Sequence, residues 1–241
     1  MFTSSTLLCA VIGFAAGILL RVPVERLIGG AGGSLLVSAS GAPPRVVARG
    51  GGGWPRPRPA LALGLVTGAV FAALAWRLGP GLDLLAFLVL AAAGVVLAVV
   101  DLRTFRLPDA VVASLFLAGL TLLGIEALAL DEFRAYVRAL LGALALSAFH
   151  LVLAVARAGA LGWGDVKLAA VLGFHLGWLG WDVLAAGAFL SFTGAGVTAV
   201  VMLATHRARP ETVLAFGPWM LVGALGGVLC GEELVTAYLG W

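Results

Sequence analysis

The 241-residue sequence has little charge and no side-chain amides. Charged residues make up only 11% of the chain, which contains no Asn or Gln and a single Lys, Lys167. Soluble domains carry roughly 25% charged residues, so this chain could not cover a surface that faces water. Hydrophobic residues make up 62% of it. The composition therefore excludes a soluble globular protein and predicts one that is solvated by lipid.

Cysteine is also scarce. The two cysteines, Cys9 and Cys230, lie far apart, each within an apolar stretch. They can form neither a disulfide framework nor a cysteine-rich metal cluster, and we expect no metal site. The formal net charge is only +3, and we expect no nucleic-acid partner.

Eight apolar stretches are long enough, or nearly so, to span a bilayer as helices. They cover residues 5–20, 60–76, 84–100, 110–130, 135–156, 167–181, 183–204 and 212–230. The sixth is the shortest and borders the seventh at Asp182, which requires a tight turn there. Glycines four residues apart, such as Gly173 and Gly177, indicate close helix packing. The sequence therefore predicts an all-α, polytopic helical membrane protein with about eight transmembrane helices.

The positions of the basic residues predict the orientation in the membrane. With the N-terminus outside, most of the Arg residues and Lys167 fall at the cytoplasmic ends of the predicted spans. The reverse orientation would place this excess of Arg outside. We therefore expect both termini to lie outside.

Residues 21–59 form the one long segment between predicted spans, and they are rich in Gly, Pro, Ser and Arg. Such a stretch cannot bury enough apolar surface to offset the entropy of ordering it, so we predict a flexible basic loop. This loop either sets the topology only or lies on anionic lipid headgroups. It belongs to an N-terminal two-helix region, residues 1–78, which precedes a six-helix core, residues 79–241.

Two acidic residues stand in unusual sequence at cytoplasmic ends of predicted helices. Asp101 follows the apolar run 84–100 and begins the stretch Asp-Leu-Arg-Thr-Phe-Arg-Leu-Pro-Asp, which ends at Asp109. Asp165 lies in Gly-Trp-Gly-Asp-Val-Lys, residues 162–167. Taken singly, each would be a helix cap or a boundary charge. If the third and sixth helices pack together, the two carboxylates can approach one another at one membrane face.

A pair of adjacent carboxylates can carry out proteolysis. Both cannot ionise easily, so the pair shares one proton. The ionised member can take a proton from water, while the neutral member polarises the scissile carbonyl and later protonates the leaving amine. Gly162 and Gly164 would let a substrate backbone come close, and Pro108 can start the next helix at its first turn. Lys167 could tune the charge of Asp165 or pair with a lipid headgroup.

These motifs carry a resemblance to a known family. The stretch from Asp101 to Asp109 resembles the first aspartate motif of the prepilin peptidases (type IV leader peptidases). Residues 162–167 match their Gly-x-Gly-Asp-x-Lys motif, and Phe-Gly-Pro at 216–218 resembles a segment of their last helix. The resemblance covers residues 84–230.

The resemblance implies a membrane aspartic endopeptidase that removes the short basic leader of prepilins or pseudopilins. The active site would face the cytoplasm, and the protein would be a multi-pass protein of the cytoplasmic (inner) cell membrane. Asp101 and Asp165 would be the catalytic pair. The implied supporting or substrate-binding residues are Gly162, Gly164, Lys167, Pro108 and Asp109.

The N-terminal region departs from the family pattern. Bifunctional members carry two Cys-x-x-Cys pairs after the first helix, which are associated with zinc, and they also methylate the new N-terminus. The equivalent segment here, residues 21–59, contains no Cys. We therefore expect a peptidase-only member without zinc, which would need S-adenosylmethionine only if it retained methyl transfer.

Two other classes of function are compatible with the same sequence features. A proton-coupled membrane transporter or channel could use the same carboxylates, although such sites usually lie near the bilayer midplane on broken helices. A non-catalytic membrane scaffold for a secretion or pilus machine is the third interpretation. The position of both acids at one cytoplasmic boundary argues against the transporter, and the intact carboxylate pair argues against the scaffold.

Overall fold

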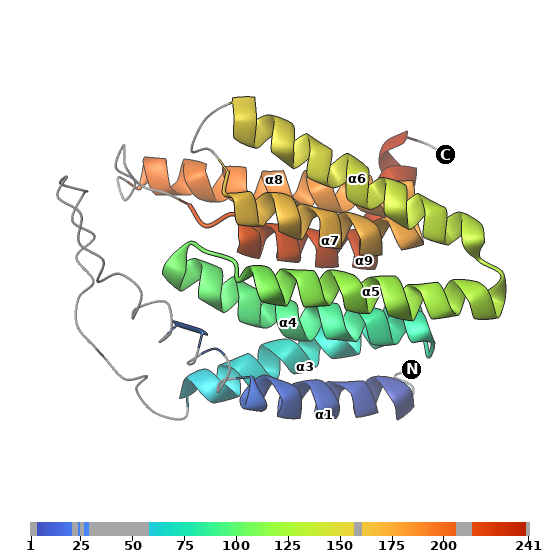
Figure 1. Ribbon diagram of the computed structural model, residues 1–241. Helices are drawn as coiled ribbons and strands as arrows, with labels where there is room; N and C mark the ends of the chain where they lie inside the picture. The colour runs from blue at the N-terminus through green and yellow to red at the C-terminus, as the bar shows by residue number, and fades with distance from the viewer. Residues whose placement is uncertain are drawn as a thin grey trace.

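A computed structural model shows a protein built from packed helices (Figure 1). It describes residues 4–20, 24, 27–28, 58–156, 161–205 and 214–239, and this part of the chain contains no strand. The helices are α1 (Ser4–Leu19), α3 (Arg58–Leu78), α4 (Leu82–Thr104), α5 (Asp109–Leu130), α6 (Phe133–Ala156), α7 (Trp163–Leu179), α8 (Trp181–Ala204) and α9 (Gly217–Leu239). The predicted all-α class is confirmed. Most of the predicted basic loop 21–59 lies outside the described residues.

Successive helices run in opposite directions along the bundle (Figure 1). The last residues of α1, α4, α6 and α8 therefore lie at one end of the bundle, together with the first residues of α5, α7 and α9. The start of α1 and the end of α9 lie at the opposite end (Figure 1). This arrangement brings the segments that carry Asp101 and Asp165 to the same end.

The lengths of the helices fit a polytopic membrane protein. Among the described residues, five helices are long and apolar enough to cross a membrane, and they are Ala60–Leu78, Leu82–Thr104, Asp109–Leu130, Phe133–Ala156 and Trp181–Ala204. The apolar helices Ser4–Leu19 and Gly217–Gly231 are shorter. With 17 residues, α7 is at the short end of the range for a spanning helix.

The structure shifts two predicted boundaries around α7. The helix begins at Trp163, four residues before the predicted span, because Asp165 caps its first turn. The tight turn to α8 is at Gly180 rather than at Asp182. The backbone N–H of Gly180 still donates to the carbonyl oxygen of Leu176, so the last turn of α7 is closed before the chain reverses.

Helix α7 packs against α5, α6, α8 and α9 within the bundle. Its side chains Leu168, Phe174 and Leu176 are buried. The closest approach is to α6, where a Cβ on Gly173 would collide with the carbonyl oxygen of Gly142. Lipid tails are as apolar as leucine, so such backbone contact is what holds membrane helices together. The close packing predicted from Gly173 and Gly177 is confirmed.

Arg138 of α6 fixes the far end of α7. Its Nε donates to the carbonyl oxygen of Gly177 at 2.7 Å, and its Nη2 donates to those of Trp178 at 2.6 Å and Leu179 at 3.3 Å. Carbonyl groups in a last helical turn lack partners within the helix, and a positive charge is favourable there. Arg138 therefore satisfies the C-terminal end of α7 inside the bundle.

The connection from α4 to α5 is short and held by local hydrogen bonds. Phe105 adopts the left-handed conformation with φ 50° and donates its N–H to the carbonyl oxygen of Asp101. The Thr104 hydroxyl donates to the carbonyl oxygens of Val100 and Arg106. Pro108, with φ −67°, stands at the N-cap of α5, directly before the first helical residue. These contacts fix the segment that follows Asp101.

Candidate active site

Asp101 lies in the last turn of α4 and is only 5% exposed. Its Oδ2 accepts a hydrogen bond from the backbone N–H of Gly217, the first residue of α9, at 3.1 Å. N–H groups in a first helical turn have no partner within the helix and favour negative charge nearby. A Cβ at position 217 would lie 2.7 Å from the same carboxylate oxygen. Glycine at 217 therefore permits this contact.

Asp165 lies in the first turn of α7 and is 8% exposed. Its Oδ2 accepts a hydrogen bond from the backbone N–H of Gly162 at 3.0 Å, and its own N–H donates to the carbonyl oxygen of Gly162. Asp165 is thus a helix-capping residue, as an isolated aspartate at such a position would be. The capping interaction uses one carboxylate oxygen and fixes the direction of the side chain.

Both carboxylates line one cavity of about 720 Å³ at this end of the bundle. The cavity is formed by residues 100–101 and 104–109 around the α4–α5 connection, residues 161–165 at the start of α7, and residues 214–216 before α9, with Leu27. The three sequence segments singled out by motif, which are far apart in the chain, therefore meet around the same space.

The electrostatics of Asp165 reflect its burial and its neighbour. It stands outside the five helices that are long and apolar enough to cross a membrane. Burial raises the pKa of Asp165 to about 6, the hydrogen bond from Gly162 opposes this shift, and the negative charge of Asp101 adds to it.

Gly162 and Gly164 have different surroundings. A Cβ on Gly164 would lie 3.0 Å from the Cβ of Leu107, a buried residue of the α4–α5 connection. A Cβ on Gly162 would first meet Asp165 Oδ2 at 3.4 Å, which is an ordinary contact. Gly164 therefore lets the two motif segments pack together, a role that the sequence did not suggest for it.

Lys167 and Asp109 form an ion pair that links the two motifs. The distance from Lys167 Nζ to Asp109 Oδ1 is 2.7 Å, and both side chains are largely exposed. The sequence suggested either Asp165 or a lipid headgroup as the partner of Lys167. Its partner in the structure is Asp109, the first residue of α5, so the pair connects the first turns of α5 and α7.

The residues do not fit a cysteine-rich zinc site. Structural zinc needs four ligands, usually Cys and His. In the described part of the chain, no group of three or more His, Cys, Asp or Glu side chains could hold a metal ion. Cys9 lies on α1 and Cys230 on α9, and the sequence has no other Cys.

The fold and this cavity together define a polytopic helical membrane protein with two buried carboxylates at one end of its bundle. The sequence pattern of the type IV leader peptidase family matches residues 88–230. The chain belongs to that family, as the motifs predicted. The matched region begins within α4 and includes Asp101, Asp165 and Gly217.

Three of the curated relatives that carry the name prepilin leader peptidase/N-methyltransferase illustrate the similarity. The chain is 33% identical to the protein from Stutzerimonas stutzeri over 180 residues, which are 74% of this chain and 60% of the relative. It is 32% identical to that from Bacillus subtilis over 177 residues (73% of this chain, 67% of the relative). It is 39% identical to that from Dickeya chrysanthemi over 173 residues (68% and 58%). The chain thus spans about 60% of the length of such relatives. No solved structure matches it.

The predicted site residues largely come together. Asp101, Pro108, Asp109, Gly162, Gly164 and Asp165 line the cavity, and Lys167 contacts one of them. Sequence reasoning missed Leu107, whose contact with Gly164 nothing in the sequence indicates. It also did not include Gly217 in the site, although the Phe-Gly-Pro resemblance at 216–218 pointed to that segment.

Proposed function

We propose that this protein is a membrane aspartic endopeptidase that cleaves the leader peptide of type IV prepilins or pseudopilins at the cytoplasmic face of the cell membrane. The observation that carries the proposal is that Asp101 and Asp165 line one cavity, within the region that matches the type IV leader peptidase family. Relatives that share this region are named for leader peptidase activity.

Asp101 and Asp165 are the catalytic pair in this proposal, with one member ionised and the other neutral. The ionised carboxylate takes a proton from a water molecule whose oxygen attacks the scissile carbonyl carbon. The neutral member hydrogen-bonds to the carbonyl oxygen as negative charge develops there. The carbon–nitrogen bond then breaks, and the departing nitrogen takes up a proton from the pair.

The other predicted residues position this pair or the substrate. Gly162 donates to Asp165, and Gly164 allows the α4–α5 connection to approach α7. Pro108 stands at the N-cap of α5, and the ion pair of Asp109 and Lys167 joins the first turns of α5 and α7. Their proposed role is to hold two carboxylates on separate helices in fixed relative positions.

The cavity lies at the end of the bundle opposite the start of α1. The Arg distribution supports a cytoplasmic location for this end under the positive-inside rule. A leader peptide rich in basic residues would remain on that side and meet a cavity lined by three acids, Asp101, Asp109 and Asp165. We therefore place the active site at the cytoplasmic side and both termini outside.

The proposal assigns peptide cleavage without methyl transfer. The names of the relatives include an N-methyltransferase activity, which requires S-adenosylmethionine. Residues 21–59 of this chain contain none of the cysteines found in the bifunctional pattern. Incubation with labelled S-adenosylmethionine and cleaved pilin should give no labelled pilin, and clear labelling would contradict this part.

The test of cleavage uses two conservative substitutions. Asp101→Asn and Asp165→Asn should each abolish leader removal from a prepilin in membranes, because each removes the shared ionisable pair while preserving side-chain size. Membrane insertion should be unchanged in both. Asp131→Asn, at an exposed position after α5, is the matched control and should cleave normally. Normal cleavage by either active-site variant would show that the dyad assignment is wrong.

A second experiment separates the peptidase from a proton-coupled transporter or channel. The carboxylates are at one end of the bundle, whereas transporter sites usually lie near the midplane. A transporter would show carboxylate-dependent flux across proteoliposomes and no cleavage. The peptidase should cleave in detergent, where no gradient exists.

A further inference from the structure

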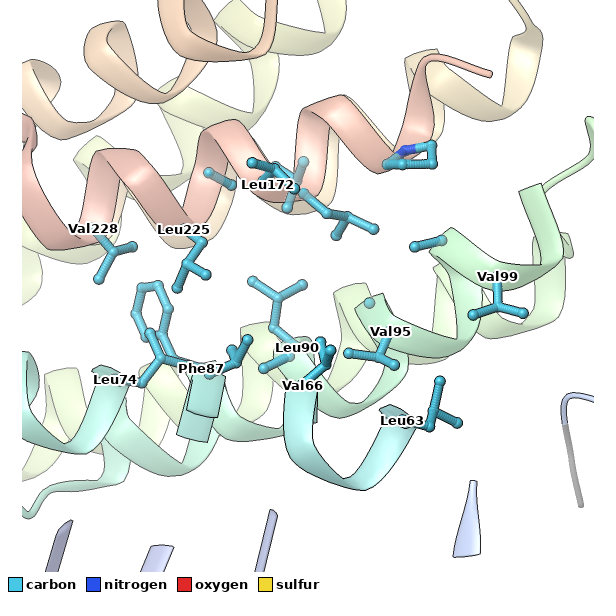
Figure 2. A pocket seen from close by; sticks show the side chains of 18 of the residues that line it. Leu63, Val66, Leu74, Phe87, Leu90, Val95, Val99, Leu172, Leu225 and Val228 are labelled. Carbon is cyan, nitrogen blue, oxygen red and sulfur yellow. The ribbon is translucent and has the colours of Figure 1, made fainter. Parts of the chain in front are cut away.

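A second cavity, separate from the carboxylate site, lies between α3, α4 and α9, with two residues of α7 at its inner side. It has a volume of about 430 Å³. The labelled side chains in Figure 2 come from these four helices and surround this space. We call it the α3–α4–α9 groove. It has no role in the chemistry described above.

The groove is apolar and open to the surface. All its lining residues are apolar, from Ala62 on α3 to Val228 on α9. The lining residues Val66 and Val222 are 54% and 60% exposed. The helices α3 and α4 that form much of it contain candidate membrane spans. An occupant must therefore be apolar and must enter from the lipid.

One end of the groove lies next to the carboxylate site. Pro218 lines the groove, and the residue before it, Gly217, donates its N–H to Asp101. On α4, Val99 lines the groove, while Val100 and Asp101 line the carboxylate cavity. A molecule that fills the groove would end beside Asp101.

We propose that the α3–α4–α9 groove binds an apolar transmembrane helix of the substrate, which adjoins the bond cleaved between Asp101 and Asp165. This proposal rests on the proposed peptidase function. A peptide segment within lipid must satisfy its backbone hydrogen bonds internally, so a substrate that continues from the site into the groove must be helical there. The groove thus selects substrates whose cleavage site borders a membrane helix.

The lining favours a helix over a lipid chain or a second copy of this protein. Ala91, Gly94 and Ala98 recur at helical spacing along α4, and small residues allow a second helix to approach closely. The lining on α4 runs from Phe87 to Val99, roughly 18 Å at 1.5 Å per residue. That length matches about three helical turns. Because the groove ends beside Asp101, its position favours the cleaved substrate as occupant over a lipid or a second copy of this protein.

The kinetic test fills the groove without changing the site. Ala91 lines the groove about ten residues before Asp101, and its neighbour Ala92 is similarly half-buried but lines neither cavity. The full-length variants Ala91→Phe and Ala92→Phe are compared with wild type. One peptide carries a basic leader, the cleavage site and a 20-residue apolar helix, and the other ends shortly after the cleavage site.

Ala91→Phe should raise KM for the helix-containing peptide by roughly ten-fold or more, with little change in kcat. Cleavage of the short peptide by Ala91→Phe, and of both peptides by Ala92→Phe, should match wild type. Equal KM values for wild type and Ala91→Phe would overturn the groove proposal and leave the peptidase function standing. If wild type cleaves neither peptide, the peptidase function fails and the groove proposal fails with it.

A crosslinking measurement guards against misfolding of Ala91→Phe. A photoreactive amino acid at the groove residue Val222 should crosslink to the apolar segment of the longer peptide in membranes. The same group at Leu117 on α5, which is 63% exposed and outside the groove, should not. Crosslinks from position 222 only to lipid, or only to a second copy of the protein, would overturn the proposal.

Discussion

The backbone N–H of Gly217 donates a hydrogen bond to Oδ2 of Asp101 over 3.1 Å, although 116 residues separate the two in sequence. This bond joins the start of α9 to the end of α4 beside the carboxylate cavity. It depends on the absence of a side chain at 217, where a Cβ would lie 2.7 Å from that oxygen. The position of Asp101 is therefore set by a residue of the last helix.

Gly217→Ala should lower kcat for leader cleavage by roughly ten- to a hundred-fold, because the added methyl group displaces the Asp101 carboxylate, and small displacements of reacting groups have effects of that order. The protein should still fold and insert into membranes. Gly196→Ala on α8 is the control, since a Cβ there has no neighbour within 4 Å. A kcat of wild-type size in Gly217→Ala would mean that the Gly217–Asp101 contact does not position the catalytic group.

A comparison of Gly164→Ala with Gly162→Ala separates packing from substrate approach. A Cβ on Gly164 would press against Leu107 at 3.0 Å, whereas one on Gly162 would make an ordinary contact at 3.4 Å. Gly164→Ala should destabilise the protein by about 1–3 kcal/mol, the usual cost of overpacking, and reduce cleavage. Gly162→Ala should leave thermal stability near wild type. If Gly162→Ala loses cleavage at unchanged stability, that glycine serves substrate approach.

Much of this arrangement could be predicted from the sequence because membrane helices leave strong signals. Long apolar runs located the helices, and the scarcity of charge made Asp101 and Asp165 stand out. Their shared location followed from counting spans, since helix ends two, four or six crossings apart lie on the same side. That reasoning required the chain to alternate direction, as it does in the structure (Figure 1).

Contacts between distant residues could not be predicted in the same way. Nothing in the local sequence of Arg138 indicates that it reaches the carbonyl groups at the end of α7. The partner of Lys167 depends on how α5 and α7 pack, and that packing depends on side chains along both helices. The predicted start of α7 was wrong because the pattern of apolar residues contains no information about the helix cap that Asp165 forms.

The Lys167–Asp109 ion pair should affect positioning more than stability. Exposed ion pairs contribute only about 0–1 kcal/mol, so Lys167→Met and Asp109→Asn should have thermal unfolding close to wild type. Each should lower kcat/KM several-fold, because the pair joins the first turns of the two motif helices. The double variant should be no worse than either single one, which indicates a shared role. Effects that multiply in the double variant would show that the two residues act independently.

The raised pKa of Asp165 makes a prediction about stability against pH. Its pKa rises from 3.8 to about 6 on folding, so the folded protein holds this proton more tightly than the unfolded chain does. The stability that this proton contributes is present below about pH 4 and is lost as the pH rises through about 6. Ionised Asp165 therefore destabilises the fold at neutral pH, mainly because the carboxylate is buried.

Asp165→Asn removes this ionisation while its amide oxygen can still accept the hydrogen bond from Gly162. The variant should unfold at a higher temperature than wild type at pH 7.5, by an amount that corresponds to on the order of 2–3 kcal/mol. At pH 4 the difference should largely vanish, since wild-type Asp165 is then protonated. Thermal unfolding in detergent across this pH range measures both. An equal difference at the two pH values would show that the substitution acts through packing and not through the charge of Asp165.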